Sequence, residues 1–247
     1  WFDYEVDVDV ASSTTLESDL AYISTHLDVS LAERNTASCS YVLFDGGLLA
    51  KYIRLSKAAA EGVGVNRYSP ARTLREFLYM IGVHPKKVVF FSKNSSAKDL
   101  LGMVKGDVYY IERLTEGATG FTKPFNLESS KMRGVSALAS RFREELKNVS
   151  GVSLHPYVVY ARFDSFKRVY RLEFAAEGDE DAYETADKLF KVISAVSVSG
   201  YPYQLMRADQ LARIGDRDVE KLASILGLSL EPRGREPLEV LTFVRRR

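Results

Sequence analysis

The chain has 247 residues, which fits one large domain or two small ones and allows a substantial hydrophobic core. Hydrophobic residues make up 46% and charged residues 27%, as is ordinary for a soluble globular protein. The 34 basic and 33 acidic residues nearly cancel. The composition therefore lacks the basic signature of many nucleic-acid binders, and any such binding has to come from a local patch.

Cysteine content and hydropathy limit the compartment and the class of protein. Cys39 is the one cysteine, which excludes an internal disulfide and a cysteine-rich zinc site and suits a reducing cytoplasm. No run is long enough to cross a bilayer, and the start lacks the layout of a signal peptide. We expect a cytoplasmic protein without membrane association. Because the chain begins at Trp1 directly in a strand-like segment, we also expect residues upstream.

The first half of the chain alternates helical and strand patterns. Tyr4–Val10 alternates apolar residues with acids, the period of a half-buried strand. A helix follows after a cap at Ser13 or Thr14, with one apolar face, and the residues of that face are Leu16, Leu20, Ile23, Leu27 and Leu31. This helix should end within Asn35–Ser38, and Tyr41–Phe44 reads as a buried strand that runs into a turn.

The rest of the chain also contains helix and strand patterns. The segment after Gly47 is rich in helix patterns, with Leu74, Leu78 and Ile81 as the clearest apolar row. The later elements predicted from the sequence are strands at Val88–Phe91 and Val108–Ile111, a loop at Gly117–Ser130, a helix at Ser136–Leu146, a hairpin of Tyr157–Phe163 and Val169–Phe174, helices at Ala182–Val196, Arg207–Ile214 and Val219–Leu226, and a strand at Leu238–Val244. These patterns predict a single mixed α/β domain.

Asp45 is the first candidate for chemistry. It follows a buried apolar strand and precedes Gly46 and Gly47, at the end of the strand where α/β sheets place their ligands. A carboxylate there can bind a divalent cation, and the glycines allow a phosphate backbone to come close. Asp-Gly after a strand is also common in ordinary turns.

Glu17 is the second candidate, on the helix that precedes this strand. An acid at the edge of the buried helix face can complete a carboxylate cluster, and two-metal nucleases need such a cluster. A solvated glutamate in the first turn of a helix is equally typical. Asp19, Asp28 and Glu33 lie on the same helix and compete for this role.

The third candidate is the segment Gly-Tyr-Pro-Tyr that begins at Gly200. It forms a rigid turn presenting Tyr201 and Tyr203, with Arg207 and Asp209 on the helix after it. Aromatic rings near a basic residue can stack on bases or hold a phosphate, although packed core tyrosines have the same pattern.

Other charged residues have plainer explanations. Lys93 after the second buried strand could contact a phosphate, although most lysines at strand ends are simply solvated. Arg162 and Glu173 lie in adjacent strands of the hairpin, where a cross-strand ion pair is expected. The three histidines are scattered along the chain, so a histidine metal site is not expected.

Several segments together resemble the NurA nuclease family, in the same order along nearly the whole chain. They are YVLFDGGLL, VVFFSKNSSAKDLL, YVVYARF, VYRLEF and GYPYQLMRADQLARI. The resemblance implies an α/β fold with an RNase H-like mixed sheet flanked by helices, forming a NurA-type domain over residues 1–247. It implies Asp45 as a metal-binding catalytic aspartate, and Tyr201 and Asp209 as the C-terminal signature pair.

The sequence departs from the family pattern in places. Gly47 stands where the family usually has serine, and Asp209 stands where some relatives have histidine. The family's first catalytic aspartate has no match here, so it lies upstream of Trp1 or is absent. Glu17 would carry the helix glutamate, with Glu33 as the alternative.

By resemblance, the expected activity is metal-dependent DNA hydrolysis with Mn²⁺ or Mg²⁺, as a single-strand endonuclease and 5′-to-3′ exonuclease in the resection of double-strand breaks. Asp45, Glu17 and Asp209 would be the metal ligands, with Tyr201 orienting the substrate, and Lys93, Arg162 and Arg207 would contact DNA. The expected partners are a HerA-type hexameric translocase and a second copy of the chain. The alternatives are a non-catalytic NurA-like subunit that binds HerA or DNA, and a different RNase H-like enzyme that cleaves RNA.

Overall fold

The structure is a computed structural model that describes residues 16–61, 69–165 and 167–212, together with residues 215, 217, 220, 221 and 224. The predicted strands at Tyr4–Val10 and Leu238–Val244 lie outside the described residues, as does most of the predicted helix Val219–Leu226. Within the described ranges, no helix has both the length and the apolar character needed to span a membrane.

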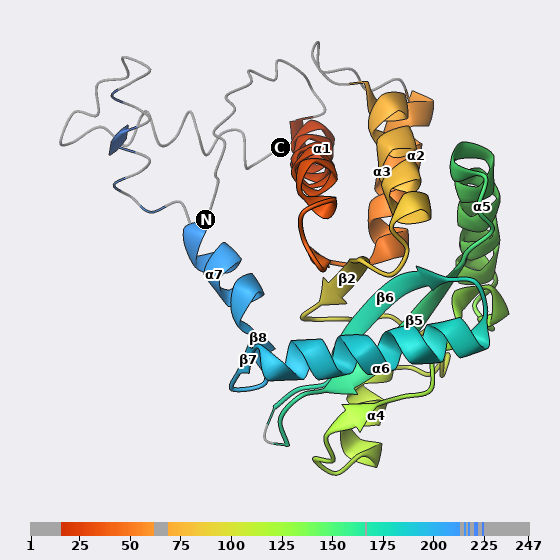
Figure 1. Cartoon of the computed structure of the whole chain (residues 1–247), viewed down its shortest axis with the longest axis vertical. Coiled ribbons are helices and arrows are strands. Elements are labelled where there is room, and N and C mark those ends of the chain that lie inside the picture. The colour runs from red at the N-terminus through yellow and green to blue at the C-terminus, as the bar shows by residue number, and fades with distance from the viewer. Residues whose placement is uncertain are drawn as a thin grey trace.

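Helices and strands are interspersed along the chain (Figure 1). In chain order they are α1 (Leu16–Thr36), β1 (Val42–Asp45), α2 (Leu48–Glu61), α3 (Pro70–Val83), β2 (Val88–Ser92), α4 (Asp107–Leu114), β3 (Gly120–Phe121), β4 (Phe125–Asn126), the 3₁₀ turn η1 (Leu127–Ser129), α5 (Arg133–Ser150), β5 (His155–Arg162), β6 (Tyr170–Ala176), α6 (Asp179–Ala195), β7 (Ser197–Val198), β8 (Tyr201–Pro202) and α7 (Tyr203–Leu211).

The main sheet is mixed and has the strand order β1-β2-β6-β5-β3, with β4 also paired to β5. Strands β1 and β2 are parallel, with Asp45 opposite Phe91, whereas β6 runs antiparallel to both β2 and β5. A separate small hairpin pairs β7 with β8. The predicted mixed α/β sheet flanked by helices is confirmed, while its RNase H-like classification and the single-domain boundary stay predictions.

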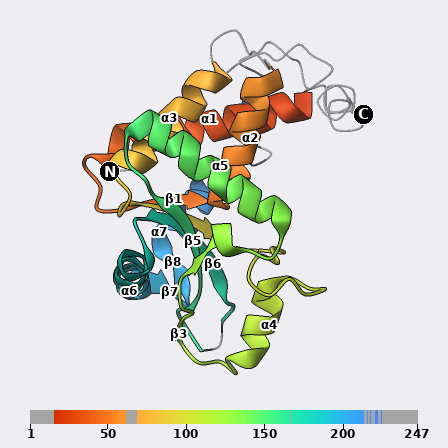
Figure 2. The same cartoon turned by 90° about the vertical axis from the view of Figure 1, so that its right-hand side faces the viewer.

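Helices cover both faces of this sheet (Figure 2). Helices α1, α2, α3 and α5 pack on one face, and α6 packs on the other, so each face has its own hydrophobic core. Strand β6 shows why: Leu172 and Phe174 belong to the α6 side, whereas Ala175 belongs to the opposite core. Alternate residues of a strand point to opposite faces, so a strand between two helical layers is buried throughout.

Helix α1 exists as predicted, but the predicted buried face is wrong in part. Leu27 and Leu31 are 40% and 47% exposed, whereas Tyr22 and Val29 are buried. Polar contacts explain the rotation, because the Tyr22 hydroxyl lies 3.1 Å from Thr73 Oγ1 of α3. A buried tyrosine needs such a partner for its hydroxyl, and leucine can be left at the surface at lower cost.

The strand predicted at Val108–Ile111 is wrong, because these residues lie in helix α4. Only Asp107 and Ile111 of this helix are buried, one helical turn apart. Asp107 accepts hydrogen bonds from the backbone N–H groups of Leu100 and Leu101, both at 2.9 Å, which anchors the first turn. The β-forming residue types Val-Tyr-Tyr-Ile are therefore overridden by tertiary contacts.

The predicted loop Gly117–Ser130 contains the short strands β3 and β4 and the turn η1, which add to the edge of the sheet at β5. The other predicted elements agree with the structure within a few residues. Helix α7 begins at Tyr203, four residues ahead of the predicted start at Arg207.

Candidate active site

Asp45 is the last residue of β1, at the edge where the parallel strands β1 and β2 end together. Its side chain is 59% exposed, so its carboxylate faces solvent. The chain turns sharply after it: Gly46 adopts φ +96°, and its N–H donates to the Phe91 carbonyl at 2.9 Å. A positive φ of this kind favours glycine. The expected position of Asp45 at the carboxyl end of a strand is confirmed, although the strand is only partly buried, with Phe44 as its one buried residue.

Lys93, just beyond the end of β2, bridges two carboxylates. Its Nζ lies 3.3 Å from Asp45 Oδ2 and 2.6 Å from Asp209 Oδ2. The second distance is that of a charge-assisted hydrogen bond. Lys93 therefore ties the end of the parallel strands β1 and β2, at one side of the sheet, to helix α7, which comes late in the described chain.

Tyr201 reaches the same place from the β7–β8 hairpin. Its ring packs at 5.8 Å, centroid to centroid, against both Phe91 and Tyr170, and the Lys93 ammonium lies 5.8 Å from the ring centroid. Gly200 makes this possible: it adopts φ +73°, and a Cβ there would lie 2.7 Å from Asp164 Cβ. The Gly200-Tyr201 pair thus places the tyrosine ring beside the two acids.

Electrostatics at this cluster favour a charged lysine and a neutral tyrosine. Partial burial lowers the pKa of Lys93, but hydrogen bonding to Asp209, with Tyr201 and Asp45 nearby, outweighs it and the pKa rises. Burial raises the pKa of Tyr201, against the opposing effect of the Lys93 ammonium. The Tyr201 hydroxyl is buried and makes no regular hydrogen bond within the described structure. At neutral pH, Lys93 is therefore a charged ammonium and Tyr201 a neutral phenol.

The acids of α1 divide into three cases. The side chain of Glu17 lies outside the described residues, and Glu33 is exposed. Asp28, in contrast, forms a 2.6 Å ion pair with Lys51 of α2. Lys51 Cε lies 4.0 Å from the position of a Cβ at Gly46, so Asp28 approaches the turn after Asp45 through this lysine.

A buried ionic network lies directly beneath the turn. Glu173 of β6 accepts hydrogen bonds from the Leu49 N–H at 3.3 Å and from Arg171 Nε at 2.8 Å. Gly47 packs closely against Glu173 and leaves no room for a side chain, because a Cβ at this position would lie 2.6 Å from Glu173 Oε1. Glu173 thereby places a carboxylate at the N-terminus of α2, where the helix dipole favours negative charge.

The network continues from Arg171 across the sheet. Arg171 Nη2 lies 2.5 Å from Asp99 Oδ2, and Nη1 donates to the Tyr160 hydroxyl at 2.8 Å. That hydroxyl in turn donates to Asp107 Oδ2 at 2.8 Å. Burial raises the pKa of Asp99, although Arg171 counteracts this. We did not anticipate this network from the sequence, although Arg171 and Glu173 alternate in one strand and so share a face.

The remaining predicted residues are placed as follows. The expected Arg162–Glu173 ion pair is wrong: Glu173 lies opposite Val158 in the register and pairs with Arg171. Arg162 is buried and donates from Nη2 to the Glu112 carbonyl at 3.1 Å. Arg207 hydrogen-bonds to Gln210 on its own helix at 2.8 Å. Neither arginine is part of the Lys93 cluster.

Metal-binding capacity rests on two carboxylates. Among the described residues, no group of three or more His, Cys, Asp or Glu side chains is arranged to hold a metal ion. Asp45 and Asp209 nevertheless supply exposed oxygen ligands on either side of one cationic group. Mg²⁺ and similar hard cations are commonly bound by one or two carboxylates with water and substrate phosphates, so the pair fits such an ion in donor type and access.

Comparison with known proteins places the chain in a family. A family model described as the NurA domain matches residues 11–214. The DNA double-strand break repair nuclease NurA of Sulfolobus acidocaldarius is 27% identical over 222 residues, covering 81% of this chain and 61% of the relative. The nuclease of the same name from Saccharolobus solfataricus is 25% identical over 227 residues, covering 83% and 63%.

The fold also has a structural relative. The crystal structure of the NurA nuclease from Sulfolobus solfataricus superposes with a TM-score of 0.64 at 22% identity, covering 88% of this chain and 69% of the other. The chain spans about three-fifths of the length of the curated relatives that it matches. Since the family model covers most of its length, the chain belongs to the NurA family.

Proposed function

We propose that this chain is a metal-dependent deoxyribonuclease that hydrolyses phosphodiester bonds with Mn²⁺ or Mg²⁺. The observation that carries the proposal is the meeting of Asp45, Lys93 and Asp209 at one solvent-exposed edge of the sheet. The names of the curated relatives, both DNA double-strand break repair nucleases, support DNA as the substrate.

Asp45 and Asp209 would hold the cation. Their carboxylates are exposed and lie on either side of the Lys93 ammonium, so a small cation and a phosphate could both reach them. Glu17 remains a candidate third ligand, and Asp28 is the described acid of α1 that approaches the Asp45 turn. A bound divalent cation would supply Lewis acidity and activation of water.

Lys93 and Tyr201 would act on the substrate phosphate. The Lys93 ammonium has three rotatable donors and can turn from the carboxylates to a phosphate oxygen. The Tyr201 hydroxyl is protonated and buried beside the Lys93 ammonium, so it would meet a non-bridging phosphate oxygen once that ammonium turns towards the substrate. Hydrolysis adds one water to phosphorus and breaks one P–O ester bond, so stabilising the charge on phosphate is the task that these side chains would share.

In the cell, we propose a role in resecting double-strand breaks with a HerA-type hexameric translocase, as a single-strand endonuclease and 5′-to-3′ exonuclease, and as a homodimer in the cytoplasm. Membership of the NurA family supports this role. Arg207 on α7, the same helix as Asp209, would contact DNA close to the carboxylates.

A non-catalytic subunit that binds HerA or DNA is the second candidate. One observation favours it: within the described ranges, two acids rather than three meet at the Lys93 cluster. Such a subunit would keep the fold and the buried network beneath the turn, and it would not hydrolyse DNA.

A nuclease assay separates the two. The full-length protein is incubated with labelled single-stranded DNA and Mn²⁺, beside Asp45→Ala and the control Glu184→Ala. The control acid is matched in exposure, at 58% against 59%, and lies on the distant helix α6. We expect cleavage in the wild type and in Glu184→Ala, with a loss of at least about 1,000-fold in Asp45→Ala. Absence of cleavage in all three proteins, with and without HerA, would favour the non-catalytic subunit.

A further inference from the structure

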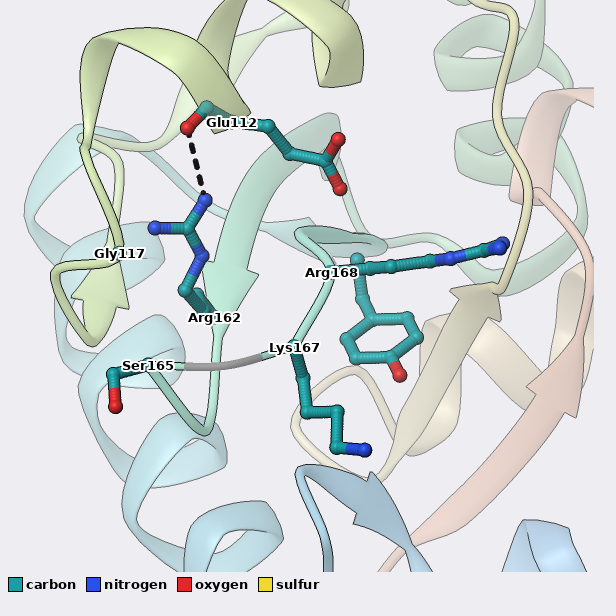
Figure 3. A pocket seen from close by; sticks show the side chains of 7 residues that line it. Glu112, Gly117, Arg162, Ser165, Lys167 and Arg168 are labelled. Atoms are coloured by element: carbon teal, nitrogen blue, oxygen red, sulfur yellow. Dashed lines mark hydrogen bonds between the residues drawn. The ribbon is translucent and has the colours of Figure 1, made fainter.

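A pocket beside the end of β5 contains a buried arginine with unused hydrogen-bond donors (Figure 3). Arg162 is the last residue of β5 and is 5% exposed. Its Nη2 donates to the Glu112 carbonyl at 3.1 Å, whereas Nε and Nη1 are buried with no partner among the described residues. A guanidinium stays charged in proteins, and buried polar groups without partners are rare, so two free donors call for a ligand.

The pocket around this side chain has about 530 Å³ of accessible space. Its lining includes Glu112, Gly117, Arg162, Lys167, Arg168 and Tyr170. Three of these residues are basic and one is acidic, so the pocket carries net positive charge in a protein whose total charge is close to zero. Its electrostatics therefore favour an anion.

The acidic residue does not neutralise Arg162. Figure 3 shows the Glu112 carboxylate directed away from the guanidinium, which instead meets the Glu112 backbone carbonyl. The carboxylate is occupied elsewhere, because its Oε1 accepts a hydrogen bond from the Val169 N–H at 3.0 Å. The opposite wall is backbone at Gly117, which has φ +85° and no side chain to fill the space. The space beside Gly117 therefore allows an oxyanion to meet an Arg162 donor once the guanidinium, whose Nε and Nη1 are covered in this conformation, turns into the pocket.

This pocket is linked directly to the candidate active site. The ring of Tyr170, which lines the pocket, lies 5.8 Å from the ring of Tyr201, centroid to centroid. Arg168, also at the pocket, donates to Asn94 at 2.9 Å, and Asn94 directly follows Lys93. The pocket and the Lys93 cluster thus share a wall, so one extended polyanion could occupy both.

We propose that the pocket binds a second, non-scissile phosphate of the DNA strand whose scissile phosphate lies at Asp45, Lys93 and Asp209. The Arg162 guanidinium contacts that phosphate through one of its unpaired donors, in a charge-assisted hydrogen bond. This contact fixes how far along the strand the cut falls, since phosphate contacts set the register of a protein on nucleic acid. The choice of DNA rests on the proposed nuclease function.

Two arginine variants test the contact. Arg162→Met keeps the length of the side chain and removes its donors, while Arg143→Met is the control, because Arg143 is a partly buried arginine already paired with Glu128 at 2.9 Å. We expect Arg162→Met to weaken single-stranded DNA binding about tenfold, the effect of one charge-assisted contact, and Arg143→Met to bind as the wild type does. The melting temperature of Arg162→Met should equal or exceed that of the wild type, because the variant removes a buried guanidinium that makes one hydrogen bond and has two unpaired donors. A drop in melting temperature together with unchanged DNA binding would assign Arg162 a structural role and overturn the proposal.

A scan with neutral phosphates locates the contact. Single-stranded DNA with one methylphosphonate at successive positions is titrated onto the wild type and Arg162→Met in Ca²⁺, so that binding is measured without cleavage. We expect one position, outside the scissile linkage, where the substitution weakens wild-type binding about tenfold and leaves Arg162→Met unaffected, as for two groups in one interaction. Identical profiles for both proteins would overturn the proposal, and a catalytically silent chain would still give a clear result.

A free anion is distinguished by a third measurement, the melting temperature with added inorganic phosphate. A wild-type increase that is absent in Arg162→Met, combined with identical methylphosphonate profiles, would assign the pocket to free phosphate and overturn its role in DNA binding. An Arg162-dependent position in the scan supports the proposal, whatever inorganic phosphate does.

Discussion

Two regions of this protein use the same charges in opposite ways. At the sheet edge, Asp45 and Asp209 share the Lys93 ammonium, and their side chains are 59% and 43% exposed. Beneath that edge, Glu173 and Asp99 share the Arg171 guanidinium, and their side chains are 4% and 10% exposed. Each region has two carboxylates around one cation, and solvent access is what separates them.

The difference in solvent exposure indicates which pair of carboxylates can exchange its cationic partner for another cation. Arg171 is held on all sides, by Glu173, Asp99 and the Tyr160 hydroxyl, so the network is satisfied internally. Lys93 is bound only through a flexible side chain at the surface, where ion pairs are weak. We therefore assign binding and chemistry to the exposed group and the positioning of the Asp45 turn to the buried one.

Removing the central cation of each region should give unequal losses of stability. We expect Arg171→Met to lower the free energy of unfolding by about 3 kcal/mol, because Glu173 and Asp99 would remain buried without their partner. Lys93→Met should cost less than about 1 kcal/mol, because Asp45 and Asp209 can be hydrated. Urea unfolding of both variants measures this, and equal losses would remove the distinction between the regions.

The contact between the two regions can be tested at Gly47. In Gly47→Ala, the new Cβ would lie 2.6 Å from Glu173 Oε1, and Glu173 cannot move aside without losing Arg171 or the Leu49 N–H. We expect a loss of about 2 kcal/mol, in the range of overpacked sites, and a reduced cleavage rate because the Asp45 turn shifts.

Gly134→Ala is the matched control, because nothing lies within 4 Å of a Cβ there and Gly134 is in helix α5. It should be neutral or stabilising by up to about 1 kcal/mol. A Gly47→Ala protein as stable and active as the control would show that Glu173 does not constrain the turn.

The two regions also differ in how far the sequence predicted them. Asp45 ends an apolar run and precedes Gly46, a local pattern that indicates a strand end, and its predicted place is confirmed. The Gly-Tyr-Pro-Tyr pattern and the family resemblance both point to Tyr201 and Asp209, and the structure brings them to Lys93. Their roles in catalysis stay predictions.

The buried network could not be predicted in the same way. Arg162 and Glu173 were expected to pair because both lie in the hairpin, but the register places Glu173 opposite Val158 and leaves Arg162 beyond Tyr170, at the pocket. Register depends on the whole sheet and not on the charges of two residues. Asp107 was hidden for another reason: its strand-like neighbours Val108–Ile111 form a helix that its own carboxylate anchors.

Each region contains one tyrosine hydroxyl, and the two hydroxyls differ in their hydrogen bonding. The Tyr201 hydroxyl has no regular partner in the described structure, whereas that of Tyr160 donates to Asp107 and accepts from Arg171. We expect Tyr201→Phe to reduce the rate constant of cleavage about tenfold, worth about 1.4 kcal/mol, with stability unchanged. Tyr160→Phe should lower stability by about 1 kcal/mol, the contribution of a typical hydrogen bond, and affect cleavage less. Cleavage assays and urea unfolding together test this, and the reverse pattern would contradict it.

The carboxylate of Glu128 is intermediate in exposure between the two regions, and its substitution should have the smallest effect on stability. It pairs with Arg143 at 2.9 Å and contacts His155, and its side chain is 15% exposed. Burial raises the pKa of Glu128, but the His155 hydrogen bond and the charges of His155 and Arg143 outweigh it and lower the pKa. Since the folded pKa is below the unfolded value of about 4.3, the stabilisation is complete above that value and is lost as the pH falls through the folded pKa.

The matching experiment is urea unfolding of the wild type and Glu128→Gln at pH 6.5 and pH 3. The wild type should lose about 1 kcal/mol more than the variant over this interval, the contribution of a typical hydrogen bond. Glu184→Gln is the control: hydrogen bonding to Lys188 also lowers the pKa of Glu184, but this pair is exposed and screened by solvent, so its variant should follow the wild type. If the stability of Glu128→Gln changes with pH as that of the wild type does, the half-buried Glu128 pair contributes no more than an exposed pair. Burial would then strengthen an ion pair only for fully buried groups such as Arg171.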